Sequence, residues 1–96
     1  MSDAGRINET GRMNDSLDNL VRMANRIGDF FRYQPDHAAG VEGVASHIEK
    51  FWEPRMRRQI LDFLAASPDG VTQGGTAMHN IVREALSVNR SRLMPG

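Results

Sequence analysis

Cysteine is absent from this 96-residue chain, and its absence removes several kinds of chemistry at once. Without a thiol there are no disulfides, no cysteine nucleophile, and no thiolate ligands for zinc or iron–sulfur clusters. Long apolar runs are also missing, and no stretch approaches the roughly 20 apolar residues that a membrane-spanning helix needs. The first 15 residues hold no apolar core of the kind that a secretory signal needs. We therefore expect a cytoplasmic protein with no membrane partner.

An excess of charge of one sign is missing too. Lys and Arg together number 12, as do Asp and Glu, so the formal net charge is zero. A general nucleic-acid binder usually carries a basic stripe, so we expect no nucleic-acid partner. Lys50 is the single lysine, and the other basic residues are arginines, whose guanidinium groups suit carboxylate pairing. A chain of this length makes one small domain of modest stability.

The apolar residues recur with the 3.6-residue period of α-helices, and no stretch alternates as a strand would. The fold class we predict is all-α, a small bundle of about four short helices with flexible termini. The first predicted helix covers residues 16–32, with Asp15 and Asp18 capping its start, and the second is capped by Asp36 and ends at Trp52. The third begins at Pro54, and the fourth lies around residues 78–86 and is capped by Thr76.

The polar composition of both ends predicts flexible tails over residues 1–14 and 89–96 around a helical domain over 15–88, although Leu93 and Met94 can dock. Gly40 and Gly43 weaken the second helix and can instead permit a close helix approach. The shared helical phase predicts a core made by Leu20, Ala24, Ile27, Phe31, Val44, Ile48, Phe51, Ile60, Leu64, Ile81 and Val82.

Catalytic constellations are missing from the sequence. His37, His47 and His79 are not spaced as metal ligands on one helix face. Gly74-Gly75-Thr76 lacks the glycine spacing and the lysine of a phosphate-binding loop, and no G-x-S-x-G elbow occurs. We therefore expect no catalytic residue, no cofactor and no bound metal, and no enzyme activity from the chain alone.

The segment from His47 to Arg58 holds the only Trp and the only Lys, two aromatic residues in a row (Phe51 and Trp52) and three arginines. Arg58 can pair with Asp62 one turn later, whereas Arg57 points between the apolar directions of Leu61 and Leu64. Two interpretations remain open: the Arg57 stem packs along the core edge with its head in solvent, or this face meets a carboxylate of a partner. The predicted partner-binding residues are His47, Phe51, Trp52, Arg55, Met56, Arg57 and Arg58.

The same segment resembles a known family. Four stretches are similar to the delta subunit of NAD-dependent, molybdenum-containing formate dehydrogenases. They are the run Leu20-Val21-Arg22-Met23-Ala24-Asn25-Arg26-Ile27, the pair Phe30-Phe31, the string HIEKFWEPRM from His47 to Met56, and the closing VREAL at Val82–Leu86. The resemblance covers about residues 18–87.

The resemblance implies a small, non-catalytic accessory subunit without a cofactor of its own. Its partner would be the large catalytic subunit, which carries the molybdenum cofactor and iron–sulfur clusters in a soluble cytoplasmic complex that oxidises formate and reduces NAD. Its implied role is assembly or stability of that holoenzyme. The alternative is a small helix-turn-helix module that binds nucleic acid or another protein, since two helices meet at a tight corner beside Arg55, Arg57 and Arg58.

Overall fold

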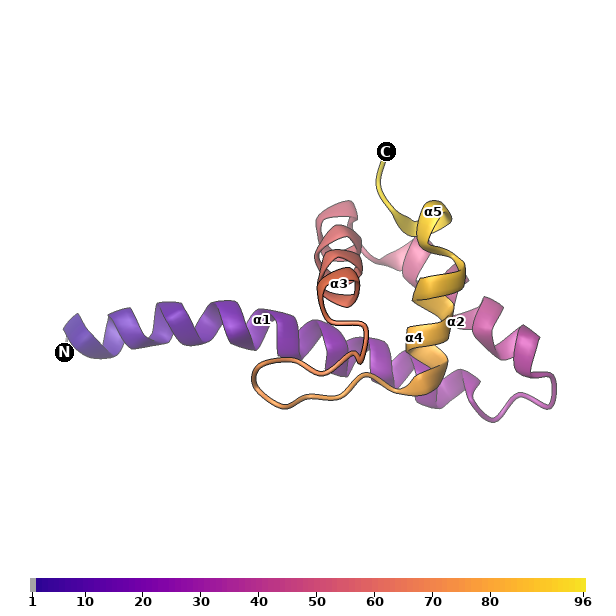
Figure 1. Cartoon of the computed structure of the whole chain (residues 1–96), viewed down its shortest axis with the longest axis horizontal. Helices are drawn as coiled ribbons and strands as arrows, with labels where there is room; N and C mark the ends of the chain where they lie inside the picture. Colours follow the sequence, from indigo (N-terminus) through magenta and orange to yellow (C-terminus); the bar gives the residue numbers. More distant parts are fainter. Residues whose placement is uncertain (1) are drawn as a thin grey trace.

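The computed structural model describes the backbone of residues 2–96 and the side chains of residues 16–96. Within that part of the chain the regular structure is helical, apart from a single bridge between Val71 and Ala77. The predicted all-α fold is confirmed. The helices are α1 (Ser2–Phe31), α2 (His37–Phe51), α3 (Pro54–Ala66), α4 (Asn80–Val88) and α5 (Arg90–Leu93) (Figure 1).

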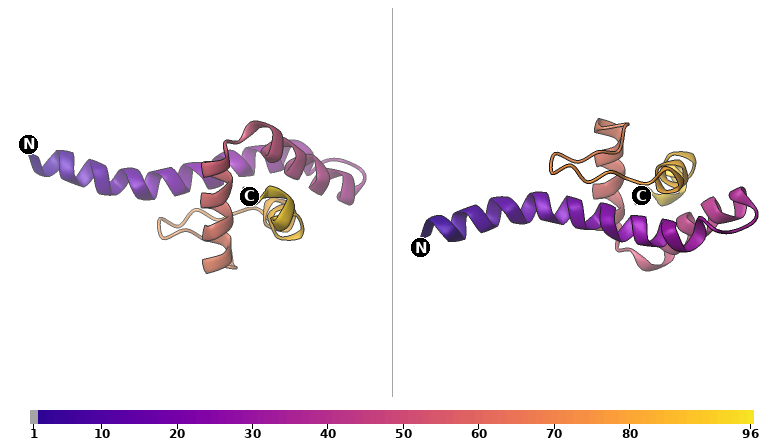
Figure 2. Two further views of the ribbon diagram at one scale, coloured as in Figure 1. Left: turned by 90° about the horizontal axis from the view of Figure 1, so that it is seen from above. Right: turned by 90° about the horizontal axis from the view of Figure 1, so that it is seen from below.

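The longest helix, α1, sets the shape of the molecule. It has 30 residues and lies along the longest dimension of 52 Å. Its C-terminal half packs against α2, α3 and α4, whereas its N-terminal half extends away from them (Figures 1 and 2). The helix starts at Ser2 and not at residue 16 as predicted. The expected mobility of residues 1–14 stays a prediction, and Met1 lies outside the described residues.

The turn between α1 and α2 forms as its sequence predicts. The Asp36 carboxylate caps α2 by accepting a hydrogen bond of 3.0 Å from the Ala38 N–H. Gly40 and Gly43 then face the end of α1. A Cβ at Gly40 would lie 2.7 Å from the Phe31 carbonyl oxygen, and one at Gly43 would overlap the Phe31 ring. The two glycines therefore permit the close helix approach.

The corner between α2 and α3 also follows the prediction. The N–H of Trp52 closes the last turn of α2 by donating to the Ile48 carbonyl at 3.0 Å, and Glu53 is extended before Pro54, the first residue of α3. The Trp52 side chain is buried in the core. The indole thus holds the corner from inside.

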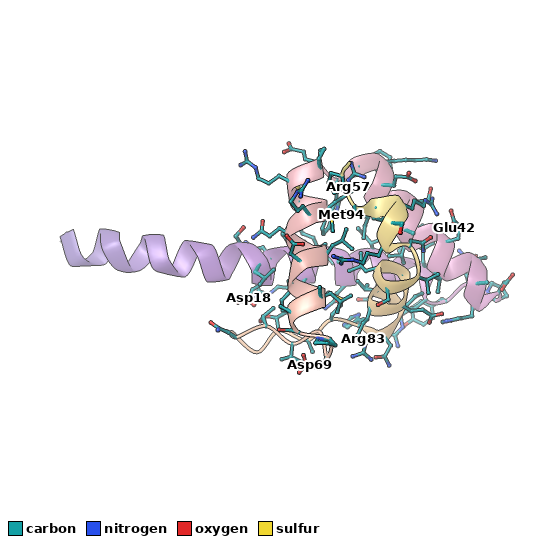
Figure 3. All side chains as sticks on the ribbon, turned by 45° about the horizontal axis from the view of Figure 1, so that its top comes forward. Asp18, Glu42, Arg57, Asp69, Arg83 and Met94 are labelled. Atoms are coloured by element: carbon teal, nitrogen blue, oxygen red, sulfur yellow. The ribbon has the colours of Figure 1, made fainter. Side chains whose placement is uncertain are left out.

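The loop from residue 67 to residue 79 differs from the prediction. Thr76 does not cap a helix, because its backbone pairs with Thr72 across a small turn, and α4 begins only at Asn80 with His79 in the cap position. Asp18 does not cap a helix either. Its carboxylate is buried beneath this loop, where it accepts a hydrogen bond from the Thr72 hydroxyl (Figure 3).

The core gathers buried side chains from every helix. Phe51 is the clear exception to the predicted set: it is 71% exposed, because the corner directs Trp52 inward and leaves Phe51 beside His47 on the outside of α2. Ile27 and Phe31 pack against the core but are only partly buried. The predicted members that are buried are Leu20, Ala24, Val44, Ile48, Ile60, Leu64, Ile81 and Val82.

The C-terminal segment completes this core. Helix α5 lies beyond residue 88, the expected end of the domain, and contacts α2, α3 and α4. The Leu93 side chain is fully buried. Leu93 thus docks, as the sequence allowed, and the expected flexibility of the rest of residues 89–96 stays a prediction.

The substitution Leu93→Ala tests this packing. Removing a fully buried isobutyl group should lower the free energy of unfolding by about 2–5 kcal/mol. The matched control is Val88→Ala, because Val88 is an aliphatic residue five positions earlier that is 72% exposed. The control should change stability by no more than about 0.5 kcal/mol. Urea denaturation followed by circular dichroism measures both, and equal effects would place Leu93 outside the core.

Candidate partner-binding surface

The predicted partner-binding residues do not share one level of exposure. Phe51, Arg55 and Arg58 are exposed on the outside of the α2–α3 corner. His47, Met56 and Arg57 are half-buried, and Trp52 is buried. The surface that a partner can touch is therefore built from Phe51, Arg55 and Arg58 with the edge of His47. Trp52 supports it from within.

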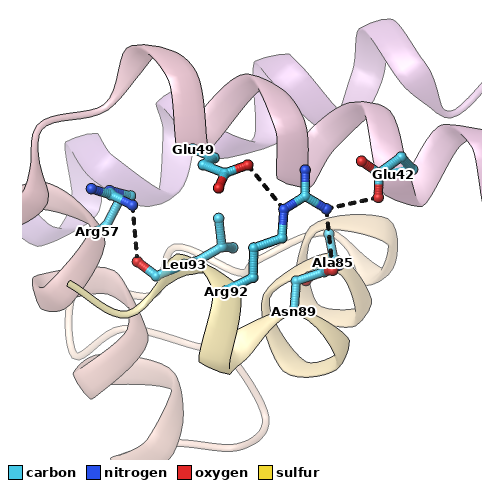
Figure 4. A network of polar contacts seen from close by, with 7 residues as sticks. All are labelled: Glu42, Glu49, Arg57, Ala85, Asn89, Arg92 and Leu93. Atoms are coloured by element: carbon cyan, nitrogen blue, oxygen red, sulfur yellow. Dashed lines mark hydrogen bonds and ion pairs between the residues drawn. The ribbon is translucent and has the colours of Figure 1, made fainter. Parts of the chain in front are cut away.

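Arg57 lies against the C-terminal segment. One terminal nitrogen donates a hydrogen bond of 3.3 Å to the Leu93 carbonyl (Figure 4). Its Nε is buried and has no hydrogen-bond partner among the described residues. The guanidinium thus meets a neutral carbonyl rather than a carboxylate. The position of Arg57 agrees with part of each interpretation drawn from the sequence. Its stem packs at the core edge, and its positive charge is not paired with a carboxylate among the described side chains.

The neighbouring arginines are similarly short of anionic partners. Arg58 donates to the Pro95 carbonyl at 3.4 Å, and the expected ion pair with Asp62 is not formed. Arg55 is exposed and makes no ion pair with a described carboxylate. Three positive charges therefore stand at the start of α3 without a negative charge bound to any of them among the side chains described.

A clamp of arginines holds α5 in place beside this corner. Arg92 bridges two carboxylates of α2, at 2.8 Å from Glu42 and 2.9 Å from Glu49 (Figure 4). Arg90 donates to the Leu61 carbonyl of α3 at 3.1 Å. The hydrogen bond from Arg92 lowers the pKa of Glu42 below its usual value of 4.5. The sequence analysis missed this clamp; the available signal was two arginines within the four residues that precede Leu93 and Met94, the apolar pair it allowed to dock.

An aromatic surface adjoins the corner along α1 and α2. The His47 and Phe51 rings lie 4.7 Å apart, and Phe30 and Phe31 make an edge-to-face pair at 4.9 Å. Phe30 is 72% exposed. A hollow of about 330 Å³ opens there, lined by Arg26, Ile27, Phe30, Phe31 and His47. The sequence analysis named Phe30 only among the residues that carry the family resemblance and did not assign it to the binding surface.

The other two histidines stand at the opposite end of α2. His37 Nε2 lies 2.8 Å from Glu84 Oε1, and His79 Nδ1 lies 3.1 Å from Asp29 Oδ1. Among residues 16–96 no three histidine or carboxylate side chains gather as metal ligands. In the same part of the chain no helix has the length and apolar character needed to cross a membrane.

Comparison with known proteins identifies the corner and its helices as parts of a described family. The family model of the NADH-dependent formate dehydrogenase delta subunit, FdsD, matches residues 19–86, from the middle of α1 into α4. The match confirms the resemblance found in the sequence. No curated protein matches the chain, and no solved structure does.

The pairing of Glu42 with Arg92 predicts a pH effect on stability. Because the pKa of Glu42 is lower in the folded protein than in the unfolded chain, the pair stabilises the protein above the unfolded pKa. That contribution is lost as the pH falls through the folded pKa. Thermal unfolding should therefore give Glu42→Gln a lower midpoint than the wild type near neutral pH, and the difference should close as the pH falls through the folded pKa of Glu42.

A second carboxylate variant controls for the general effect of losing a negative charge. Glu53→Gln removes an exposed carboxylate that makes no ion pair with a described residue. If both variants follow the same pH profile, the Arg92 contact does not contribute.

Proposed function

The chain belongs to the family of NADH-dependent formate dehydrogenase delta subunits, and from this membership we propose its role. It acts as a non-catalytic accessory subunit that binds the large catalytic subunit in the cytoplasm and supports assembly or stability of the holoenzyme. The proposed docking surface is the α2–α3 corner, with Phe51, Arg55 and Arg58 in contact and the edge of His47 beside them. Trp52, Met56 and Arg57 hold these side chains in position.

The observation that carries the proposal is the exposure of Phe51. The core buries Trp52, the residue next to it, so the exposed phenylalanine is not the result of a poorly packed corner. A large ring left in water beside unpaired arginines is typical of protein interfaces, where aromatic residues and Arg contribute most of the binding energy. The corner therefore supports docking better than it supports any chemistry of its own.

The unsatisfied charge at Arg57 supports the same proposal. Its Nε has no partner among the described residues, and its bond to Leu93 leaves the positive charge unneutralised. A carboxylate of the large subunit placed over the corner would meet the charge of Arg55, Arg57 or Arg58 with paired hydrogen bonds. Such pairing gives an interface its register and specificity.

Binding of this kind also accounts for a role in assembly. A subunit that binds only the folded form of its partner stabilises that form by mass action. The chain needs no catalytic group for this effect. The delta subunit would then raise the amount of assembled holoenzyme without changing the chemistry of formate oxidation.

Two substitutions at the corner test the proposal. Phe51→Ala and Arg55→Ala should each weaken association with the purified large subunit by roughly 10-fold or more. Since both side chains are exposed, the thermal midpoint of the free subunit should stay the same. Biolayer interferometry measures the dissociation constants and circular dichroism the midpoints.

The controls are a matched aromatic residue and a matched arginine at the far end of α2. Tyr33 and Arg32 are exposed in the turn after α1, so Tyr33→Ala and Arg32→Ala should bind as the wild type does. If the wild-type chain fails to bind the large subunit at all, the proposed function is wrong. Salt-dependent binding of a DNA duplex would instead support the helix-turn-helix alternative.

A further inference from the structure

We propose that the face between α1 and α2 is a groove for one amphipathic helix of the large catalytic subunit, with apolar side chains facing the groove and carboxylates beside them. The aromatic groove is defined by Ile27, Phe30, Phe31, His47 and Phe51. This inference rests on the proposed function, since it names the part of the partner that the docking surface receives. It extends the docking surface from the corner along both helices.

The groove is built as a binding surface rather than left over from packing. Its floor is the Phe31 ring, which lies against α2 where Gly43 has no side chain. Its walls are Phe30 on α1 and the His47–Phe51 pair on α2. Phe30 is 72% exposed and lines the hollow, and Phe51 is 71% exposed and lies against His47 beside it. A helix laid over the hollow and over the His47–Phe51 pair would bury both rings.

The charges around the groove select the partner. Arg26 lines the hollow, and Lys50 lies one turn beyond His47 on α2. Neither forms an ion pair with a described carboxylate. No acidic residue lines the hollow: Asp18 is buried against Thr72, Asp29 pairs with Arg32 and contacts His79, and Glu42 and Glu49 pair with Arg92. The rim is therefore cationic, and it fits an acidic occupant.

The same charges argue against a second copy of this chain as the occupant. In a two-fold symmetric contact through this face, the side of one copy that carries Arg26 and Lys50 would face the same cationic side of the other. Like charges would then meet across a hollow whose lining holds no acidic residue. An acidic segment of the large subunit meets the cations without this repulsion.

The occupant is a helix because of the shape of the surface. Two helices joined by a short turn leave an open seam, and a third helix fills such a seam with side chains one turn apart. The described residues offer no sheet edge that an extended segment could pair with, since Val71 and Ala77 form only an isolated bridge. The groove therefore receives apolar anchors spaced along a helix.

Photo-crosslinking in the purified complex identifies the occupant. With p-benzoylphenylalanine introduced at Phe30, mass spectrometry should find crosslinks to one helical segment of the large subunit that carries carboxylates within a turn of the linked residue. Crosslinks to a second copy of this chain, or to a segment without carboxylates, would overturn the inference.

Affinity measurements give an independent readout. Phe30→Ala should raise the dissociation constant for the large subunit roughly 10-fold or more, whereas Val88→Ala, equally exposed on α4, should leave it unchanged. Arg26→Glu should weaken binding more than Arg26→Gln, and the gap should narrow at high salt. If wild-type binding and the Phe51 effect are present but Phe30→Ala and Arg26→Glu bind as the wild type does, this inference fails while the proposed function stands.

Discussion

The close contact between α1 and α2 is the constraint on which the rest of the structure depends. It exists because Gly40 and Gly43 present bare backbone to the end of α1, where Phe31 lies. The glycines weaken α2 as an isolated helix, yet they let the helices approach and bring Val44 and Ile48 onto the α1 side of the core. The helix pair then presents two surfaces. One is closed by α3, α4 and α5, and the other remains open as the aromatic groove.

The C-terminal segment closes the first of these surfaces. Leu93 adds a buried side chain at the junction of α2, α3 and α4, and Arg92 ties α5 to two carboxylates of α2. The ion pairs are exposed, so they contribute little to stability by themselves and serve mainly to hold the segment in register. The burial of Leu93 supplies the larger part of the stabilisation. Arg57 and Arg58 also donate hydrogen bonds to backbone carbonyls of this segment, so the α2–α3 corner is linked to the C-terminal end of the chain.

The open surface fits the part played by a small subunit in a larger enzyme complex. A free domain that leaves Phe30 and Phe51 in water keeps apolar area that a partner can bury. The arginines at the start of α3 and Arg26 on α1 add positive charge that the described side chains do not neutralise. In the docking that we propose, apolar contact would supply affinity and the charges would supply specificity.

The helical class, the Asp36 cap, the Pro54 corner and most of the core could be predicted from the amino-acid sequence, because each follows from interactions within a few residues or from the 3.6-residue period. The sequence also determined the family, through the unusual string around Trp52. Tertiary structure alone decided which side of a helix end faces water. Phe51 and Trp52 are adjacent aromatic residues, and only the direction of the corner buries one and exposes the other. The positions of Asp18 and Leu93 were likewise decided by partners more than 25 residues away in sequence, Thr72 for Asp18 and Arg57 for Leu93. Local periodicity carries no information about such distant contacts.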